Sequence, residues 1–148
     1  MRKLFAILVV FLFSAVGAAA QSPGITMAEL KSMLDAGNVA YEQRRANEIA
    51  VGKNFLYLDQ CDGAGRCTEI CLYNNYVDVF PTLEAVNAWN NSRKIPEASI
   101  NSDGTLHMEL WLSGVGANGT IIIDTIGWFG AYAADLEFWS KFLSDASA

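Results

Sequence analysis

Basic residues are scarce in this 148-residue chain: ten lysines and arginines stand against sixteen aspartates and glutamates, for a formal net charge of −6. A chain this acidic is repelled by nucleic acid and by anionic lipid surfaces, so we expect neither as a partner. Histidine is rarer still, with His107 as the only one, and no motif ties a serine or cysteine nucleophile to it. Repeats, low-complexity tracts and linkers are lacking too, which predicts a single domain over residues 25–146.

Long apolar runs are confined to two stretches. The later one, "GTIIIDTIGWFGAYAADLEFW", contains Asp124 and Asp135. Two carboxylates are costly in a bilayer, so we interpret this stretch as a packed helix.

The first stretch, residues 1–20, has Arg2 and Lys3 before an apolar core that ends in Ala18-Ala19-Ala20. This pattern is typical of a secretory signal peptide, and the core is short for a membrane span. We therefore expect cleavage after Ala20, a periplasmic or secreted protein and no stable membrane insertion after cleavage. The remaining 128 residues carry eight basic and sixteen acidic side chains and are enough for one core.

The remaining patterns predict an α+β domain with a mostly antiparallel sheet and three helices. Residues 26–37 form a helix with a capping box of Thr26 and Glu29, a natural stop at Gly37 and an apolar stripe. The stripe comprises Met27, Leu30, Met33 and Leu34. Residues 38–45 and 47–54 are weak strands or a loose hairpin, and residues 54–61 and 66–77 are stronger strands.

A second helix is expected over residues 82–94, with Thr82 as N-cap and Leu83, Val86 and Trp89 as its apolar stripe. A hairpin over residues 98–112 turns at Asp103-Gly104. A closing helix runs from about Thr120 to Leu143. Its expected apolar face comprises Ile122, Ile126, Phe129, Ala133 and Leu136, widened by Trp128, Tyr132, Trp139 and Phe142.

Strict alternation in the second strand of that hairpin predicts one buried and one solvent- or ligand-covered face. The expected buried side chains are Leu106, Met108, Leu110 and Leu112. The expected outward side chains are Thr105, His107, Glu109 and Trp111. We take His107, Glu109 and Trp111 as a candidate binding face.

All three cysteines lie within "CDGAGRCTEIC". A hairpin symmetric about Ala64 places Cys61 opposite Cys67, close enough for a disulfide. The same register places Tyr57 opposite Cys71 and Asp59 opposite Glu69. Cys67 and Cys71 would lie about 13 Å apart on one strand, so Cys71 is expected to be a free thiol or to bridge two chains.

Two other interpretations of the cysteines are open. A zinc site could add Asp59, Asp62 and Glu69 to the thiolates, but the spacings are C-x5-C and C-x3-C and no histidine is near. A thiol-redox centre would need C-x-x-C, which is absent. Oxidising export favours the disulfide, and we expect no metal and no cofactor.

The order of these segments, above all "CDGAGRCTEICLYNNY", "TLEAVNAWNNSRK" and "ASINSDGTLHMELWL", resembles the YbjN-like bacterial proteins, described as sensory transduction regulators. The resemblance covers residues 25–143 and is sharpest at Asn87, Trp89 and Asn90. It implies a fold like that of type III secretion chaperones: helix, three strands, helix, two strands, helix. The first hairpin would be clipped. It also matches Cys61 and Cys67 to a cysteine pair of exported members. It places Cys71 at a usually polar position, so we expect the Cys71 thiol to be partly accessible.

The resemblance brings no catalytic residues. We therefore expect an exported, non-catalytic module of the bacterial envelope that binds an unidentified protein or peptide, with a homodimer as a further candidate. The alternative is a protein that binds a small ligand or metal, or an enzyme without a recognised motif. A flat or grooved apolar patch would favour the first, and a pocket with a perturbed titratable group the second.

The leader generates the first prediction. The exported protein should begin at Gln21, because the bond after Ala20 follows the A-x-A pattern. Intact-mass measurement and N-terminal sequencing of the protein from its native cells will check this. A leader retained in the membrane pellet would contradict it.

Overall fold

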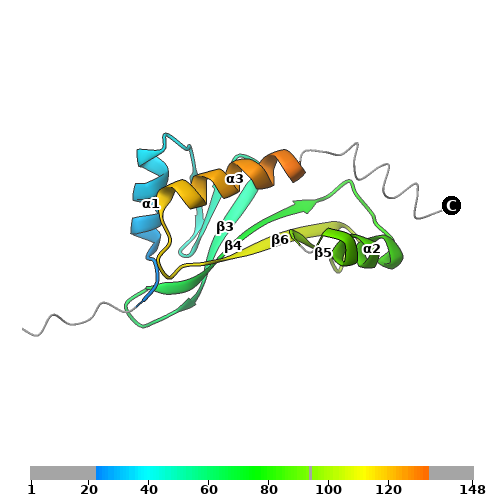
Figure 1. Ribbon diagram of the computed structural model, residues 1–148, viewed down its shortest axis with the longest axis horizontal. Helices are drawn as coiled ribbons and strands as arrows, with labels where there is room; N and C mark the ends of the chain where they lie inside the picture. The colour runs from blue at the N-terminus through cyan, green and yellow to red at the C-terminus, as the bar shows by residue number, and fades with distance from the viewer. Residues whose placement is uncertain (1–22, 94, 134–148) are drawn as a thin grey trace, which may run out of the picture.

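The computed structural model describes residues 23–93 and 95–133, which form three helices and one antiparallel sheet of six strands in the order β1-β2-β3-β4-β6-β5 (Figure 1). The elements are α1 (Met27–Ala36), β1 (Glu42–Arg45), β2 (Glu48–Val51), β3 (Asn54–Cys61), β4 (Cys67–Tyr76), α2 (Leu83–Arg93), β5 (Glu97–Ile100), β6 (Leu106–Ser113) and α3 (Gly119–Ala133). The expected α+β class is confirmed. Four strands precede α2 where the resemblance implied three, because β1 and β2 form a complete hairpin.

The first helix begins and ends where the sequence indicates. Thr26 Oγ1 accepts a hydrogen bond from the Glu29 amide at 3.2 Å, and the Glu29 carboxylate accepts one from the Thr26 amide at 2.8 Å, which completes the capping box. Leu30 and Leu34 are fully buried. The helix stops at Gly37, and Asn38 takes the left-handed conformation with φ of 54°.

One face of the sheet carries the core. Alternate residues of the central strands point into it: Leu56, Leu58, Ile70, Leu72, Leu106 and Met108. Helices α1 and α3 lie on this side of the sheet (Figure 1), and their side chains Leu30, Leu34, Ile122, Ile126 and Phe129 belong to the same cluster. Every second residue of the central strands and the side chains along one face of α3 therefore pack together in a single core.

Residues 134–143 of the expected closing helix lie outside the described residues. Up to Ala133 the expected stripe of Ile122, Ile126 and Phe129 is confirmed, and Trp128 is 40% exposed.

Two expected orientations are wrong. Thr105 is buried rather than outward, because its hydroxyl is held within the β5–β6 turn by the Asp103 carboxylate at 2.6 Å. Leu83 is 61% exposed, because α2 packs through Ala85, Val86 and Trp89 and Leu83 falls outside that arc of the helix. Leu110 and Leu112 point to the core side as expected but are only half-buried.

Two residues on which the expected YbjN-like resemblance rests hold α2 against the edge strand β5. Trp89 is buried and its Nε1 donates to the Pro96 carbonyl at 2.8 Å. The Asn90 side chain donates to the Ala98 carbonyl and accepts from the Ala98 amide, both at 2.8 Å. Asn90 thus occupies the position that another strand would take. Asn87, in contrast, is exposed.

The β3–β4 hairpin has the expected register. Cys61 pairs with Cys67, Asp59 with Glu69 and Tyr57 with Cys71. Cys61 and Cys67 form a disulfide, which confirms that interpretation of the cysteines and indicates an oxidising compartment.

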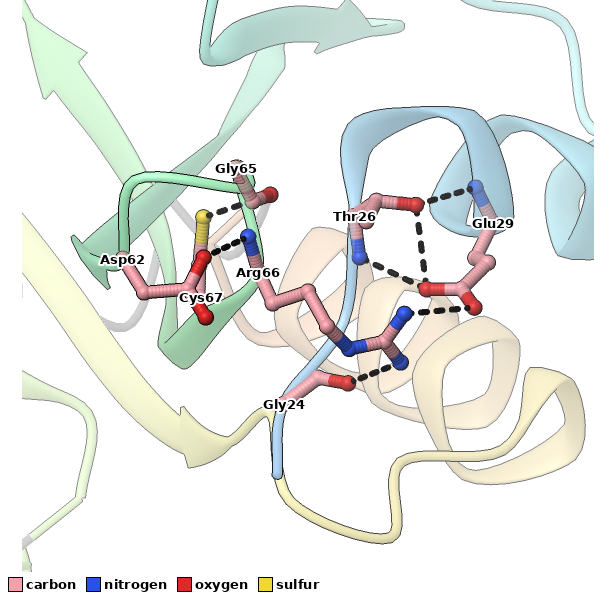
Figure 2. Close-up of polar contacts among 7 residues, drawn as sticks. All are labelled: Gly24, Thr26, Glu29, Asp62, Gly65, Arg66 and Cys67. Carbon is pink, nitrogen blue, oxygen red and sulfur yellow. Dashed lines mark hydrogen bonds and ion pairs between the residues drawn. The ribbon is translucent and has the colours of Figure 1, made fainter. Parts of the chain in front are cut away.

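A polar clasp joins the hairpin tip to the start of α1 (Figure 2). Arg66 donates to the Gly24 carbonyl at 2.7 Å and pairs with the Glu29 carboxylate at 3.2 Å. Beside it, Ile25 and Cys67 exchange two backbone hydrogen bonds of 2.8 and 2.9 Å. The backbones pack so closely that a Cβ on Gly24 would lie 2.5 Å from the Cys67 carbonyl oxygen, so Gly24 is required there.

The disulfide generates the second prediction. The double substitution Cys61→Ser and Cys67→Ser should lower the free energy of unfolding by about 2 kcal/mol, because the unfolded chain loses a closed loop. The sheet should persist, because the register is also held by core burial. Urea denaturation followed by circular dichroism will measure the difference. Wild-type protein reduced before unfolding is the control and should show a similar loss; equal stability of the oxidised wild type and the variant would contradict the prediction.

Candidate functional site

The face of the sheet opposite α1 and α3 carries the candidate site, and no described helix lies over it. We call it the outer face. Its side chains come from β3 (Phe55, Tyr57, Asp59), β4 (Glu69, Cys71, Tyr73, Asn75), β5 (Glu97, Ser99) and β6 (His107, Glu109, Trp111). The expected binding residues His107, Glu109 and Trp111 are therefore brought together on one face with aromatic residues of the neighbouring strands.

Aromatic side chains form the middle of the outer face. The rings of Phe55 and Tyr73 stack with centroids 5.1 Å apart, and the Tyr73 ring lies 5.6 Å from that of His107. Trp111 is 43% exposed and stands opposite Cys71, which is opposite Tyr57 in turn. An exposed indole on the same face as these rings makes a surface suited to contact with a partner.

Glu109 is the polar centre of the outer face. Its Oε2 lies 3.2 Å from His107 Nε2 and accepts a weak hydrogen bond from the Cys71 thiol at 3.9 Å. The other ring nitrogen of His107 lies 2.7 Å from Asn75 Oδ1. The carboxylate therefore stands between the thiol and the imidazole. A cysteine nucleophile needs the imidazole next to the thiol, so this order does not activate Cys71.

Cys71 is the free thiol that the register predicts, but the expectation that it is accessible is wrong: it is only 3% exposed. Its neighbours across the strands, Tyr57 and Trp111, are large enough to cover it although it points to the outer face. Burial, reinforced by the Glu109 carboxylate, raises the pKa of the thiol to about 12. Cys71 is thus protonated at neutral pH and shielded from a second chain.

A recess of about 470 Å³ lies at the β1 end of the outer face, between Arg45, Glu48, Phe55 and Tyr73. The Tyr73 hydroxyl donates to Glu48 Oε2 at 2.8 Å, and the Glu48 side chain is 8% exposed, with Arg45 3.8 Å away. Burial and the Glu48 contact raise the pKa of Tyr73 to about 12. The sequence analysis did not identify Glu48 or Tyr73 as site residues. Glu48 lies on β2, whose sequence lacks a clear alternation, so its contact with Tyr73 on β4 could not be predicted.

A second recess of about 670 Å³ opens at the ends of β3 and β4, beside Gly130 of α3. Asn74 donates to Asn54 Oδ1 at 3.1 Å on its buried side, and the buried Tyr76 hydroxyl accompanies them. Burial raises the pKa of Tyr76 to about 12. The lining also includes the charged residues Lys53 and Asp78, but it contains no serine, cysteine or histidine.

The zinc interpretation does not fit the structure. Two of its three sulfur ligands are consumed by the disulfide, and the described residues contain no cluster of three or more His, Cys, Asp or Glu side chains that could hold a metal ion. Among the helices of the described residues, none combines the length and apolarity needed to span a bilayer.

Comparison of the chain with protein-family models, with curated proteins and with solved structures gave no match. The resemblance to YbjN-like proteins and to type III secretion chaperones therefore stays a prediction.

Cys71 generates the third prediction. Its pKa is raised from 9.0 to about 12 in the folded protein, so the unfolded chain loses the thiol proton first as the pH rises. The stability contributed by the neutral thiol is complete below about pH 9 and is lost above it, at up to about 1.4 kcal/mol per pH unit. Urea denaturation at pH 8, 9 and 10 will measure this slope.

The matched control is Cys71→Ser, which keeps the size and removes the ionisable thiol. The variant should show a shallower fall between pH 9 and pH 10. Equal slopes for wild type and variant would show that ionisation of Cys71 does not cause the loss of stability at alkaline pH.

Proposed function

We propose that this protein is an exported, non-catalytic module that binds a protein or peptide on the outer face of its sheet. The observation that carries the proposal is the exposed Trp111 on a sheet face that also carries the stacked rings of Phe55 and Tyr73 and that no described helix covers. An open face of an antiparallel sheet is usually polar, so these rings call for a partner. The leader and the disulfide support export.

The sheet edges favour docking on the face over addition of a strand. The β5 edge is occupied by the Asn90 side chain, which satisfies the outward backbone groups of Ala98. The β1 edge consists of the exposed charged sequence Glu42–Arg45, and its pairing with β2 shifts register near Gln43. Charged, irregular edges oppose pairing with a further strand, so we place the partner across the rings.

The absence of an activated nucleophile on the outer face supports a non-catalytic role. Cys71 is protonated and covered, and Glu109 separates it from His107. A second candidate function, small-ligand binding, is favoured by the recess beside Glu48 and Tyr73, whose buried carboxylate and aromatic walls could hold a small polar molecule. The open shape of the surrounding sheet makes a peptide the better fit.

The fourth prediction tests the docking face. A photo-crosslinking amino acid placed at position 111 should form covalent adducts with a partner protein in the native cells. The same amino acid at position 121 should not, because Ile121 is 54% exposed but lies on α3, on the other side of the sheet. Adducts will be measured as mass-shifted bands and identified by mass spectrometry. No adduct at 111, or equal adducts at both positions, would contradict the proposal.

A further inference from the structure

The four strands β3, β4, β5 and β6 contain no lysine and no arginine. They contain four carboxylates: Asp59, Glu69, Glu97 and Glu109. All four belong to the outer face, because each shares the side of the sheet of Cys71 and Trp111. The central part of the outer face therefore carries negative charge that its own strands do not neutralise.

The carboxylates also oppose one another in register. Asp59 stands directly across from Glu69, and Glu97 directly across from Glu109. Like charges in such positions are unfavourable. His107 contacts Glu109, but no ion pair within the described residues involves Asp59, Glu69 or Glu97. A cation placed between the members of either pair would relieve this repulsion.

The two carboxylate pairs lie on either side of the level formed by Tyr57, Cys71 and Trp111. Along β6, Ser113 is the partner of Glu69, Trp111 lies two residues away, and Glu109 two residues further. Residues two apart on one strand face are separated by about 6.8 Å, so the two pairs differ by about 14 Å in height along the strands. They also lie two strand spacings, about 10 Å, apart across the sheet, because Asp59–Glu69 joins β3 to β4 and Glu97–Glu109 joins β6 to β5. The line between the pairs is therefore oblique and about 17 Å long, and it crosses the sheet between Cys71 and Trp111. An extended chain of the same period has side chains at positions i, i+2 and i+4 on one face.

We infer that the outer face binds an extended basic segment in which lysine or arginine at positions i and i+4 flanks an apolar residue at i+2. The inference rests on the proposed function and specifies its ligand. The two cations meet the pairs Asp59–Glu69 and Glu97–Glu109, and the apolar residue packs on Trp111. The wider chain agrees with this choice, since its net charge is −6 and it attracts basic partners.

The test uses three fluorescein-labelled peptides that share flanking sequence. The first contains Lys-Ser-Leu-Ser-Lys, the second the same residues in the order Lys-Lys-Leu-Ser-Ser, and the third Glu-Ser-Leu-Ser-Glu. Fluorescence anisotropy against the oxidised protein should give the tightest binding for the first peptide. That binding should weaken as salt is raised from about 20 to about 150 mM, because exposed charges are screened. Equal affinity for the second or third peptide, or no binding of the first, overturns the inference.

The decisive variants neutralise charge without changing shape. The exposed pair Glu69→Gln and Glu97→Gln should weaken binding of the first peptide by about five-fold. The matched control, Glu84→Gln and Asp124→Asn, removes the same charge from exposed positions on α2 and α3 and should leave the affinity unchanged. If both pairs weaken binding equally, net charge rather than the face is responsible, and the inference is overturned. Circular dichroism will verify that each variant is folded.

Trp111→Ala separates this inference from the proposed function. If it weakens peptide binding while the Glu69 and Glu97 substitutions do not, the outer face binds peptides without selecting basic ones, so the inference fails and the proposed function stands. If neither change affects binding, both fail. Weakening by both supports both.

Discussion

The pairing register between β3 and β4 is the constraint on which the rest of the structure depends. A slip of one residue would exchange the two faces of one strand relative to the other, so that either Asp59 or Glu69 would be buried and Leu58 or Ile70 exposed in its place. The Cys61–Cys67 disulfide fixes this register covalently. The clasp formed by Arg66 then transmits it to the start of α1.

This register gives the two faces of the sheet different side chains and different surroundings. One buries the leucine-rich core against α1 and α3, and the other presents rings and carboxylates. The same division accounts for Trp89 and Asn90, two of the residues on which the expected YbjN-like resemblance rests. Trp89 and Asn90 bind backbone groups of the segment around β5, so they maintain the edge of the sheet. We place function on the face and structural stability at the edges.

The sequence predicted which face of the sheet a side chain points to better than it predicted how deeply that side chain is buried. Symmetry about Ala64 was enough to place Cys61, Tyr57 and Asp59 opposite their partners, because an antiparallel hairpin with a central turn has few registers. Alternation in β6 likewise identified the face of His107, Glu109 and Trp111. It could not show that Cys71 is covered, since covering depends on the size of side chains that lie across two other strands. The predictions for Thr105 and Leu83 were wrong for related reasons. A hydrogen bond in the turn holds Thr105 in a buried position. Leu83 lies outside the side of α2 that packs on the protein, so it is exposed.

The recess beside Glu48 and Tyr73 was out of reach of sequence reasoning for a different reason. It depends on the pairing of β1 with β2, where the irregularity near Gln43 follows from backbone geometry rather than from a hydrophobic pattern. The hydrogen bond between Tyr73 on β4 and Glu48 on β2 crosses the intervening strand β3, and no periodicity within a single strand indicates such a contact.

The odd cysteine count has a consequence for how the protein reaches its native state. Three thiols can close three different loops, and the loop between Cys67 and Cys71 is the shortest in sequence. That bond is incompatible with a continuous β4, because four residues of strand separate the two sulfur atoms by about 13 Å. A chain that forms β4 before it meets an oxidant hides Cys71 under Tyr57 and Trp111 and leaves only the native pair to react. A chain oxidised earlier can be trapped in the wrong loop, so its yield depends on thiol–disulfide exchange to release it.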